Sequence, residues 1–358
     1  MRSMVSGAVY IILIDTMMLT CWLICPIVRV SPDEVDICDP TATKEIYKTN
    51  SRFLKSSFYT RLVPGAGNVF STTDWRLHAY LRRLLATPLS DSSVTRLEPL
   101  VASKVRLAIS RVSEEMASRR SADVYKWWLF MATDIIGELT FGESFRMLES
   151  GKKNQYSLDL ERMSQTAPIV TTFPFVAQLG QYIPLPMFQS VGKALERVVD
   201  YSRESIERYK RLLAENPSDP KPTLFTKLFD TGKNGLSDEV IISEARDYIL
   251  AGSDTTAVTL TYLVYSVCRD KRVRNKLVSE LMNLPESYTD KDLRNLPYLS
   301  HVIDEALRLH SAVPNGLPRA VPPEGAHFNG YDLPGGCSVS TQAYSLHRVP
   351  EIFPDPLW

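Results

Sequence analysis

The sequence predicts a mainly α-helical fold with a small β part. Helical periodicity of apolar residues dominates from about Leu77 to Leu281, while short alternating or β-branched stretches lie near both ends of the chain. No glycine-rich phosphate loop of either common kind is present, which disfavours a nucleotide-binding α/β fold. With 358 residues, of which 44% are hydrophobic and 23% charged, the chain is long enough to bury a sizeable core.

Residues 1–25 are a candidate membrane anchor. From Ala8 to Cys25 the sequence is apolar apart from Asp15, and a run of this length is at the short end of what spans a bilayer as a helix. A signal peptide is the rival interpretation, but Arg2 is the only early positive charge and no clear small-residue cleavage site follows. A buried helix is the third interpretation of this segment.

The next elements follow from local patterns. Pro26 to Ile37 alternates and is rich in β-branched residues, which predicts a strand, a turn and a second strand. Helical periodicity then dominates, with expected interruptions at 65–68, 166–174 and 214–222, where glycine, proline and polar residues gather.

The longest predicted helix runs from Ser237 to Leu281. Ser237 suits the N-cap, and the acidic pair that follows it suits the positive end of the helix dipole. A shorter helix is expected from about Tyr298 to His310. Proline and glycine then become dense from Pro314 to Pro356, with short β-like pieces between them.

Charge and cysteine content exclude some classes of function. Lys plus Arg and Asp plus Glu each number 41, so nothing in the net charge favours nucleic acid. The few scattered cysteines do not form a disulfide framework and suit a reducing, cytosol-facing compartment. Neither they nor the histidines have zinc-site spacing. The five cysteines are Cys21, Cys25, Cys38, Cys268 and Cys337.

The motif AGSDTT, residues 251–256, interrupts the apolar face of the long predicted helix. Gly252 costs about 1 kcal/mol relative to alanine in a helix interior, and the polar residues compete for backbone hydrogen bonds. The helix is therefore expected to bend or open there. Gly252 would leave room beside the helix, and Asp254 next to Thr255 could pass protons. The alternative is a kinked core helix whose hydroxyls bond to their own backbone.

Three further motifs carry charge. Glu305 and Arg308 lie three residues apart on one helix face and can pair, either as a buried latch or as a solvated surface pair. His78 and Arg82 lie one helical turn apart and could grip an anion, although a solvated basic face is the alternative. Arg319 follows a proline in a short extended piece, where it could equally be a surface arginine.

Together and in this order, the four motifs resemble the cytochrome P450 family over roughly residues 26–358. AGSDTT resembles the oxygen-binding groove of the family's long central helix, and EALR resembles the Glu-x-x-Arg motif of the helix behind the haem. HAYLRR resembles the fungal form of the helix that holds the haem propionates. The sequence from Leu317 onward resembles the family's small β region, and 53–62 and 127–145 are similar to fungal members of secondary metabolism.

The resemblance implies a haem b-dependent monooxygenase that oxidises a lipophilic metabolite, of mycotoxin, polyketide or terpenoid type. It implies electrons from NADPH through an NADPH–cytochrome reductase, no nucleic-acid partner, and a cytosol-facing position at the endoplasmic reticulum membrane. The implied roles are proton delivery by Asp254 and Thr255, groove formation by Gly252, propionate binding by His78, Arg82 and Arg319, and a structural pair formed by Glu305 and Arg308.

The resemblance also implies a loop with the iron-ligating cysteine beyond Trp358, where this sequence ends. Cys337, in PGGC, resembles a turn of the small sheet, and Cys268 follows the AGSDTT groove by about three turns. We therefore expect residues 26–358 to form a P450 domain without its C-terminal haem-ligand loop and last helix. The alternative function is a catalytically inactive remnant that at most binds a hydrophobic ligand. A plain membrane-associated helical protein explains the apolar start but not the motifs.

Overall fold

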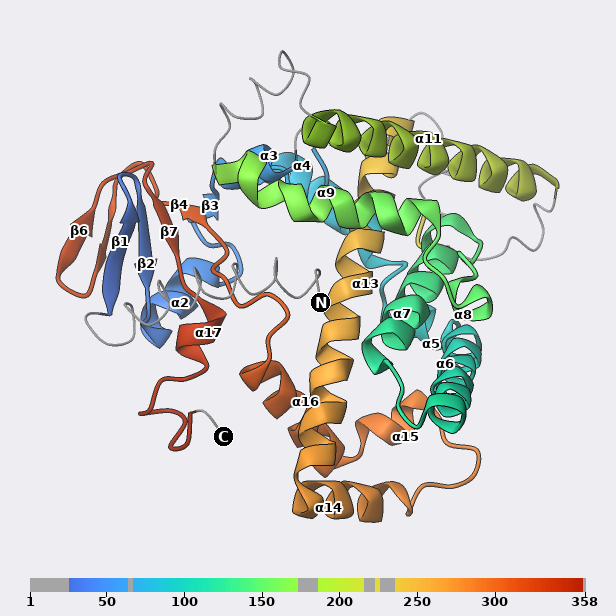
Figure 1. Cartoon of the computed structure of the whole chain (residues 1–358). Coiled ribbons are helices and arrows are strands. Elements are labelled where there is room, and N and C mark those ends of the chain that lie inside the picture. The colour runs from blue at the N-terminus through green and yellow to red at the C-terminus, as the bar shows by residue number, and fades with distance from the viewer. Residues whose placement is uncertain (1–25, 64–66, 173–185, 216–222, 226–235, 357–358) are drawn as a thin grey trace. The chain divides into compact units, whose positions relative to one another are not determined.

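The computed structural model describes residues 26–63, 67–172, 186–215, 223–225 and 236–356. The chain divides into two compact units (Figure 1). Unit 1 comprises Met1–Phe58 and His301–Trp358, and unit 2 comprises Tyr59–Ser300. Unit 1 holds the strands and unit 2 is helical, which confirms a mainly α fold whose β part comes from both ends of the chain.

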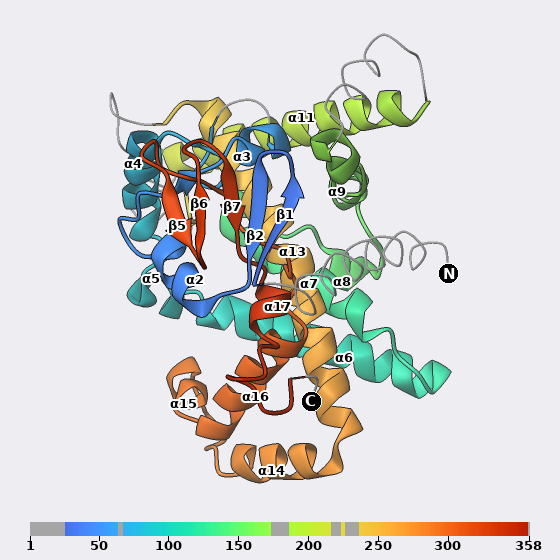
Figure 2. The same cartoon turned by 90° about the vertical axis from the view of Figure 1, so that its left-hand side faces the viewer.

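A five-stranded sheet in unit 1 joins the two ends of the chain. Figure 2 shows the blue strands of the N-terminal part beside the red β7 of the C-terminal part. The strand order is β1-β2-β7-β4-β3, in which β2 and β7 pair in parallel and the other neighbours are antiparallel. The predicted strand, turn and strand after Pro26 are confirmed as β1 and β2. The bounds are Ile27–Ser31 for β1, Glu34–Ile37 for β2, Ser338–Ser340 for β7, Arg319–Ala320 for β4 and Leu54–Lys55 for β3.

A separate hairpin consists of β5 (Ala326–Phe328) and β6 (Tyr331–Leu333). Its two-residue turn is Asn329–Gly330, with φ of 49° and 83°. Both values lie in the left-handed region, which asparagine and glycine tolerate best, and this turn matches the right-handed twist of the strands. The sequence Asn-Gly therefore fixes the register in which Phe328 pairs with Tyr331.

The core of unit 1 forms where the sheet and hairpin meet α2 (Pro40–Tyr47). Asp39 caps α2 by accepting hydrogen bonds from the backbone N–H groups of Thr41 and Ala42. Ile46 of this helix is buried together with apolar residues from both ends of the chain. The buried members of the core are Ile37, Ala42, Ile46, Phe53, Val321, Phe328, Leu333 and Val339. The short α17 (Ala343–Leu346) follows β7.

Unit 2 is organised around α13 (Asp238–Arg269), the long orange helix of Figure 1, which packs along α7 (Val124–Phe141). Two more long helices, α9 (Gln155–Thr172) and α11 (Pro186–Glu215), run side by side. The other helices within unit 2 are α4 (Trp75–Ala86), α5 (Asp91–Thr95), α6 (Glu98–Arg119), α8 (Met147–Ser150), α14 (Lys271–Leu281) and α15 (Asp290–Arg294). Two helices, α3 (Phe58–Leu62) and α16 (Pro297–Leu309), contain the points at which the chain passes between the units.

The core of unit 2 is made by apolar faces of α7 and α13 and by aromatic residues around the end of α7. Phe145 stacks on Tyr156 and Tyr201, and Phe141 meets all three rings edge-on. Asp134 of α7 is completely buried and accepts hydrogen bonds from the backbone N–H groups of Met147 and Leu148, each at 3.0 Å. The aromatic packing and this acid fix how the chain turns after α7.

Three helix predictions have clear outcomes. The helix expected near Tyr298 to His310 is confirmed as α16. The single helix predicted from Ser237 to Leu281 is wrong at Asp270, which adopts an extended conformation and accepts hydrogen bonds from the first N–H groups of α14. The interruption predicted at 166–174 is also wrong at its start, because α9 continues to Thr172.

The predicted membrane anchor, residues 1–25, lies outside the described residues. Among the helices that the structure does describe, none combines the length and apolarity needed to cross a bilayer.

Candidate functional site

The AGSDTT motif lies within α13, and the helix is continuous through it. The expectation that the helix opens there is wrong, because the hydroxyl groups bond to their own backbone. Ser253 Oγ donates to the Ile249 carbonyl at 2.7 Å, and Thr255 Oγ1 donates to the Ala251 carbonyl at 2.5 Å. These bonds satisfy the polar groups that otherwise compete with helical structure.

Gly252 is the point of close approach between α13 and α7. A Cβ atom at this position would lie 3.3 Å from Cγ1 of Ile136, which is tighter than ordinary packing allows. In unit 2 the space beside Gly252 is therefore filled by α7. Its role in an oxygen-binding groove stays a prediction.

Asp254 is exposed on α13 and has a partner that the sequence did not suggest. The hydroxyl group of Tyr125, in the first turn of α7, donates to Asp254 Oδ1 at 2.8 Å. Burial, followed by the negative charge of Asp254, raises the pKa of Tyr125 above its ordinary range, so the phenol keeps its proton. The two residues are 129 positions apart, and no local pattern links them.

His78 and Arg82 lie on α4, and Arg82 comes near α13. Asp74 caps α4, Leu81 of this helix is buried, His78 is half-buried and Arg82 is exposed. Burial and the charge of Glu244 raise the pKa of Tyr248 to about 12, and the cation of Arg82 acts in the opposite direction. Tyr248 precedes Gly252 by one turn of α13, so Arg82 lies near the helix just before the motif.

The turn before α4 is also tied to α13. Asn68 is fully buried, and its side-chain amide donates to Ser243 Oγ at 3.0 Å and to Asp247 Oδ2 at 2.5 Å. The next residue, Val69, donates its backbone N–H to Glu244 Oε1 at 2.6 Å. The sequence predicted an interruption at 65–68 but did not predict these contacts.

Arg319 lies on β4 in unit 1, where its guanidinium stacks over the ring of Tyr47 at 5.3 Å. Tyr47 also fixes the neighbouring chain, because its hydroxyl group donates to the Leu317 carbonyl at 2.9 Å and accepts from the Thr341 N–H at 3.2 Å. Arg319 belongs to a different unit from His78 and Arg82, so a common cavity for the three residues stays a prediction.

Glu305 and Arg308 form the predicted pair on α16. Arg308 Nη2 lies 2.6 Å from Glu305 Oε1, and Arg308 Nε lies 2.7 Å from Oε2. Only 8% of the Arg308 side chain is exposed, but 47% of the Glu305 side chain is exposed. Of the two alternatives, the buried latch therefore describes Arg308, whereas Glu305 is half-exposed as in a surface pair. The neighbouring Ile303 and Leu307 are also exposed, so α16 is less enclosed than its apolar sequence indicated.

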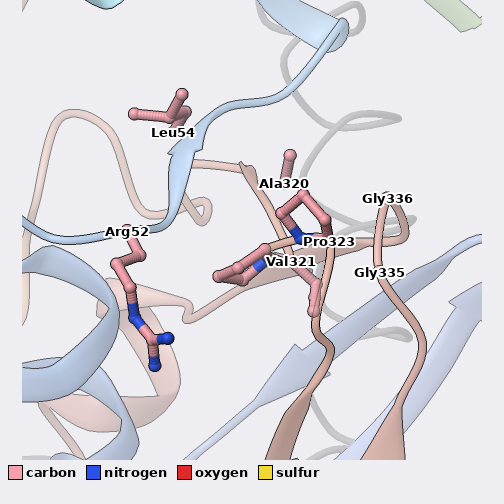
Figure 3. A pocket seen from close by; sticks show the side chains of 8 residues that line it. Arg52, Leu54, Ala320, Val321, Pro323, Gly335 and Gly336 are labelled. Carbon is pink, nitrogen blue, oxygen red and sulfur yellow. The ribbon is translucent and has the colours of Figure 1, made fainter.

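Two cavities among the described residues are not lined by the predicted site residues. One, of about 480 Å³, lies in unit 1 beside Leu54; Figure 3 shows Pro323 facing Gly335 and Gly336, with Arg52 pointing away from them. The other, of about 520 Å³, lies in unit 2 between the start of α7 and the C-terminal half of α13. It is lined by Val124, Thr261, Val264, Tyr265, Cys268 and Arg269.

Comparison with known proteins identifies the family. A sequence profile described as cytochrome P450 matches residues 26–357. The chain belongs to the cytochrome P450 family. It is 48% identical over 334 residues to cytochrome P450 monooxygenase tazI of Aspergillus terreus, an alignment that covers 92% of this chain and 68% of that protein. It is 35% identical over 336 residues to cytochrome P450 monooxygenase stcB of Emericella nidulans, with 92% of this chain and 64% of that protein covered.

A solved P450 structure has a similar fold. Retinoic acid bound cyanobacterial CYP120A1 matches with a TM-score of 0.74 at 19% identity, covering 96% of this chain and 75% of that chain. This likeness supports the fold alone. The relatives' names make this chain a cytochrome P450 monooxygenase by family, hence an oxidoreductase that works with haem.

A P450 haem needs a cysteine thiolate as its iron ligand, and coordination to the metal itself removes the proton from a thiol. Burial, followed by the charges of nearby acids, raises the pKa of Cys38 to about 11, and burial also raises the pKa of Cys337. Cys268 is exposed on α13, 13 residues and hence about 20 Å beyond Thr255. The spacing of His78 and Arg82 by one turn of α4 suits the propionates of a haem, and the described residues assign no cysteine to its iron.

Proposed function

We propose that this chain is a haem b-dependent monooxygenase that inserts one oxygen atom into a lipophilic metabolite of fungal secondary metabolism. The observation that carries the proposal is that Gly252, Asp254 and Thr255 occupy the middle of α13, one to two turns after Tyr248, whose pKa is affected by the charge of Arg82. The fungal relatives named cytochrome P450 monooxygenases support the reaction class. Mycotoxins, polyketides and terpenoids are the metabolite classes that we propose.

In this proposal, residues of α4 bind the haem cofactor. Haem supplies the iron that activates dioxygen when it is bound, and the protein supplies binding, orientation and electrostatics. His78 and Arg82 bind the propionates through charge-assisted hydrogen bonds, which suits their spacing of one helical turn. Arg319 is the third proposed propionate donor, and its stacking on Tyr47 orients the guanidinium.

Asp254 and Thr255 have the task of moving protons. Asp254 is exposed on α13, so its carboxylate can take a proton from water. The Thr255 hydroxyl donates to the Ala251 carbonyl, which leaves the lone pairs on its oxygen to accept a hydrogen bond. In this proposal Asp254 holds and releases the proton, and the Thr255 oxygen would accept a hydrogen bond from the group that receives it.

The proposed partner is an NADPH–cytochrome reductase, and the proposed location is the cytosolic side of the endoplasmic reticulum membrane. Residues 1–25 are the proposed anchor, from their apolar sequence. Fusion of these residues to a fluorescent reporter tests the location. Reporter spread evenly through the cytosol would contradict it.

The test of the proposed function is oxygen transfer. Full-length, haem-loaded protein is incubated with reductase, NADPH, isotope-labelled dioxygen and a lipophilic extract of a fungal culture. The proposal predicts products that carry one labelled oxygen atom and that require NADPH. NADPH-dependent reduction of haem with no labelled product from extracts of several producing fungi would contradict it.

The second candidate is a non-catalytic protein that at most binds a hydrophobic ligand. It is favoured by the position of Cys268, which lies about 20 Å along α13 from Thr255 and so is not beside the motif. Ligand binding without any oxygen transfer in the same experiment would favour this candidate over the monooxygenase.

A further inference from the structure

The two carboxylate oxygens of Asp254 have different surroundings. Oδ1 accepts the hydroxyl hydrogen of Tyr125 at 2.8 Å, whereas Oδ2 makes no hydrogen bond to any residue within the described ranges. Since Asp254 is exposed on α13, Oδ2 is accessible to water. One oxygen is therefore anchored and the other is available for proton transfer.

Tyr125, which holds Oδ1, belongs to α7, and the position of this helix is fixed. Tyr125 is the second residue of α7, whose start is capped by Asp123 through the Lys126 N–H at 3.0 Å. Further along, α7 meets α13 so closely that a Cβ atom at Gly252 would lie only 3.3 Å from Cγ1 of Ile136. The packing of α7 on α13 thus fixes the position of the Tyr125 phenol relative to α13.

The hydroxyl groups of the neighbouring motif residues do not orient the Asp254 carboxylate. Ser253 and Thr255 donate to carbonyls one turn earlier in α13, at Ile249 and Ala251. Among the described residues, Tyr125 is therefore the side chain that orients the Asp254 carboxylate.

The surroundings of Tyr125 keep it a hydrogen-bond donor. Burial is the largest cause of its raised pKa, and the charge and hydrogen bond of Asp254 come next. Glu161 and Asp123 add further negative charge on the same side. The phenol thus stays protonated at neutral pH and can only donate to an ionised Asp254.

We propose that Tyr125 is a positioning residue for Asp254: it holds Oδ1 and leaves Oδ2 as the oxygen that takes up and releases protons. The inference rests on the proposed function, in which Asp254 delivers protons. Tyr125 neither gains nor loses a proton in this scheme. The proton moves from water to Oδ2 and onward, and Oδ1 stays bound to the phenol.

The contact is tested first, without cofactor or turnover. Tyrosine labelled with ¹³C at Cζ is incorporated, and the Tyr125 signal is assigned by its loss in Tyr125→Phe. This signal should ionise at a higher pH than an ordinary phenol, whose pKa is about 10. In Asp254→Asn it should ionise at lower pH than in the unchanged protein. Ordinary titration in the unchanged protein, or no change in Asp254→Asn, overturns the inference.

The consequence is tested in the full-length, haem-loaded protein with reductase, by the share of NADPH electrons recovered in product. Asp254→Asn should lower this share about a hundredfold and Tyr125→Phe about tenfold, because positioning adds to a general acid without replacing it. The double variant should be no worse than Asp254→Asn, since Tyr125 acts through Asp254. Substrate affinity should not change. Tyr265→Phe, an exposed tyrosine on α13, is the control and should match the unchanged protein.

The outcomes separate the inference from the function on which it rests. If Asp254→Asn leaves electron recovery unchanged, the proposed role of Asp254 fails, and the inference fails with it. If Asp254→Asn lowers recovery but Tyr125→Phe does not, the proposed function stands and the inference is overturned.

Discussion

Arg308 is held by Glu305 on one side and by two backbone carbonyls on the other. The ion pair with Glu305 is bidentate, with nitrogen–oxygen distances of 2.6 and 2.7 Å. Arg308 Nη1 also donates to the carbonyls of His347 and Pro356, at 2.9 and 2.8 Å, and the guanidinium lies over the ring of Phe353 at 4.8 Å. The pair thereby fastens residues 347–356 to α16.

Arg308→Ala should lower the free energy of unfolding by about 3 kcal/mol, because it leaves two carbonyls and one carboxylate without their donor. The half-exposed Glu305 can be solvated, which keeps the loss below that of a fully buried pair. Urea denaturation measures the difference. Arg294→Ala, which breaks an exposed pair with Asp290, is the matched control and should cost at most about 1 kcal/mol. Equal losses of unfolding free energy in the two variants would contradict the role of the Glu305–Arg308 pair in fastening residues 347–356.

Asp134→Ala should destabilise the protein by about 2–4 kcal/mol, because two buried N–H groups, those of Met147 and Leu148, lose their acceptor. Asp270 also accepts from two N–H groups, at the start of α14, but at a more exposed position. Asp270→Ala should therefore cost only about 1 kcal/mol, as an ordinary N-cap does. Thermal unfolding of both variants measures the two losses of stability. A larger loss in Asp270→Ala than in Asp134→Ala would contradict the structural role of Asp134.

The lowered pKa of Glu115 predicts how the stability of the protein depends on pH. Its carboxylate accepts hydrogen bonds from Lys126 Nζ at 3.0 Å and Trp127 Nε1 at 2.6 Å, which lower its pKa from 4.5 to about 2. An acid whose pKa is depressed on folding stabilises the protein above its unfolded pKa, and this contribution is lost as the pH falls through the folded pKa. The free energy of unfolding should thus decrease from a pH of about 4.5 toward 2.

Glu115→Gln should flatten that part of the pH profile. The control is Glu286→Gln, since Glu286 is exposed and has no ion pair within the part of the chain that the structure describes. Urea denaturation across the acidic range distinguishes the variants. If Glu115→Gln keeps the full acid dependence, another group is responsible for it.

Arg82→Ala should weaken haem binding about tenfold to a hundredfold, which is the value of one hydrogen bond to a charged group. Arg83→Ala is the control on the same helix, because Arg83 is directed over the ring of Tyr80 at 6.0 Å. Titration with haem, followed by absorbance, gives both affinities. Equal weakening in the two variants would indicate a general effect of positive charge and would contradict a specific role for Arg82.

Much of the fold could be predicted from local patterns. The alternation after Pro26 predicted β1 and β2, and the apolar periodicity with Ser237 at its start predicted where α13 begins. The break at Asp270 was missed because the charged residues 269–272 suit the exposed face of a continuous helix, and only the cap that Asp270 makes for α14 reveals it. Pattern alone does not show where one helix replaces another without a glycine or proline between them.

The site was less predictable because its contacts join distant parts of the chain. Spacing on one helix correctly paired Glu305 with Arg308, but it could not show that Glu305 remains half exposed. Periodicity indicates which face of a helix is buried. It does not indicate which distant residue contacts that face. The contact between Tyr125 and Asp254 is of this kind, and only the packing of α7 on α13 brings the two together.

The most direct test of the account is the absorbance spectrum of the 358-residue chain with haem, reduced and exposed to carbon monoxide. The account predicts that the chain takes up haem and that Arg82→Ala weakens this uptake, because His78 and Arg82 are the proposed propionate donors. The spectrum of free haem, or equal uptake by the unchanged protein and the variant, would contradict the cofactor site.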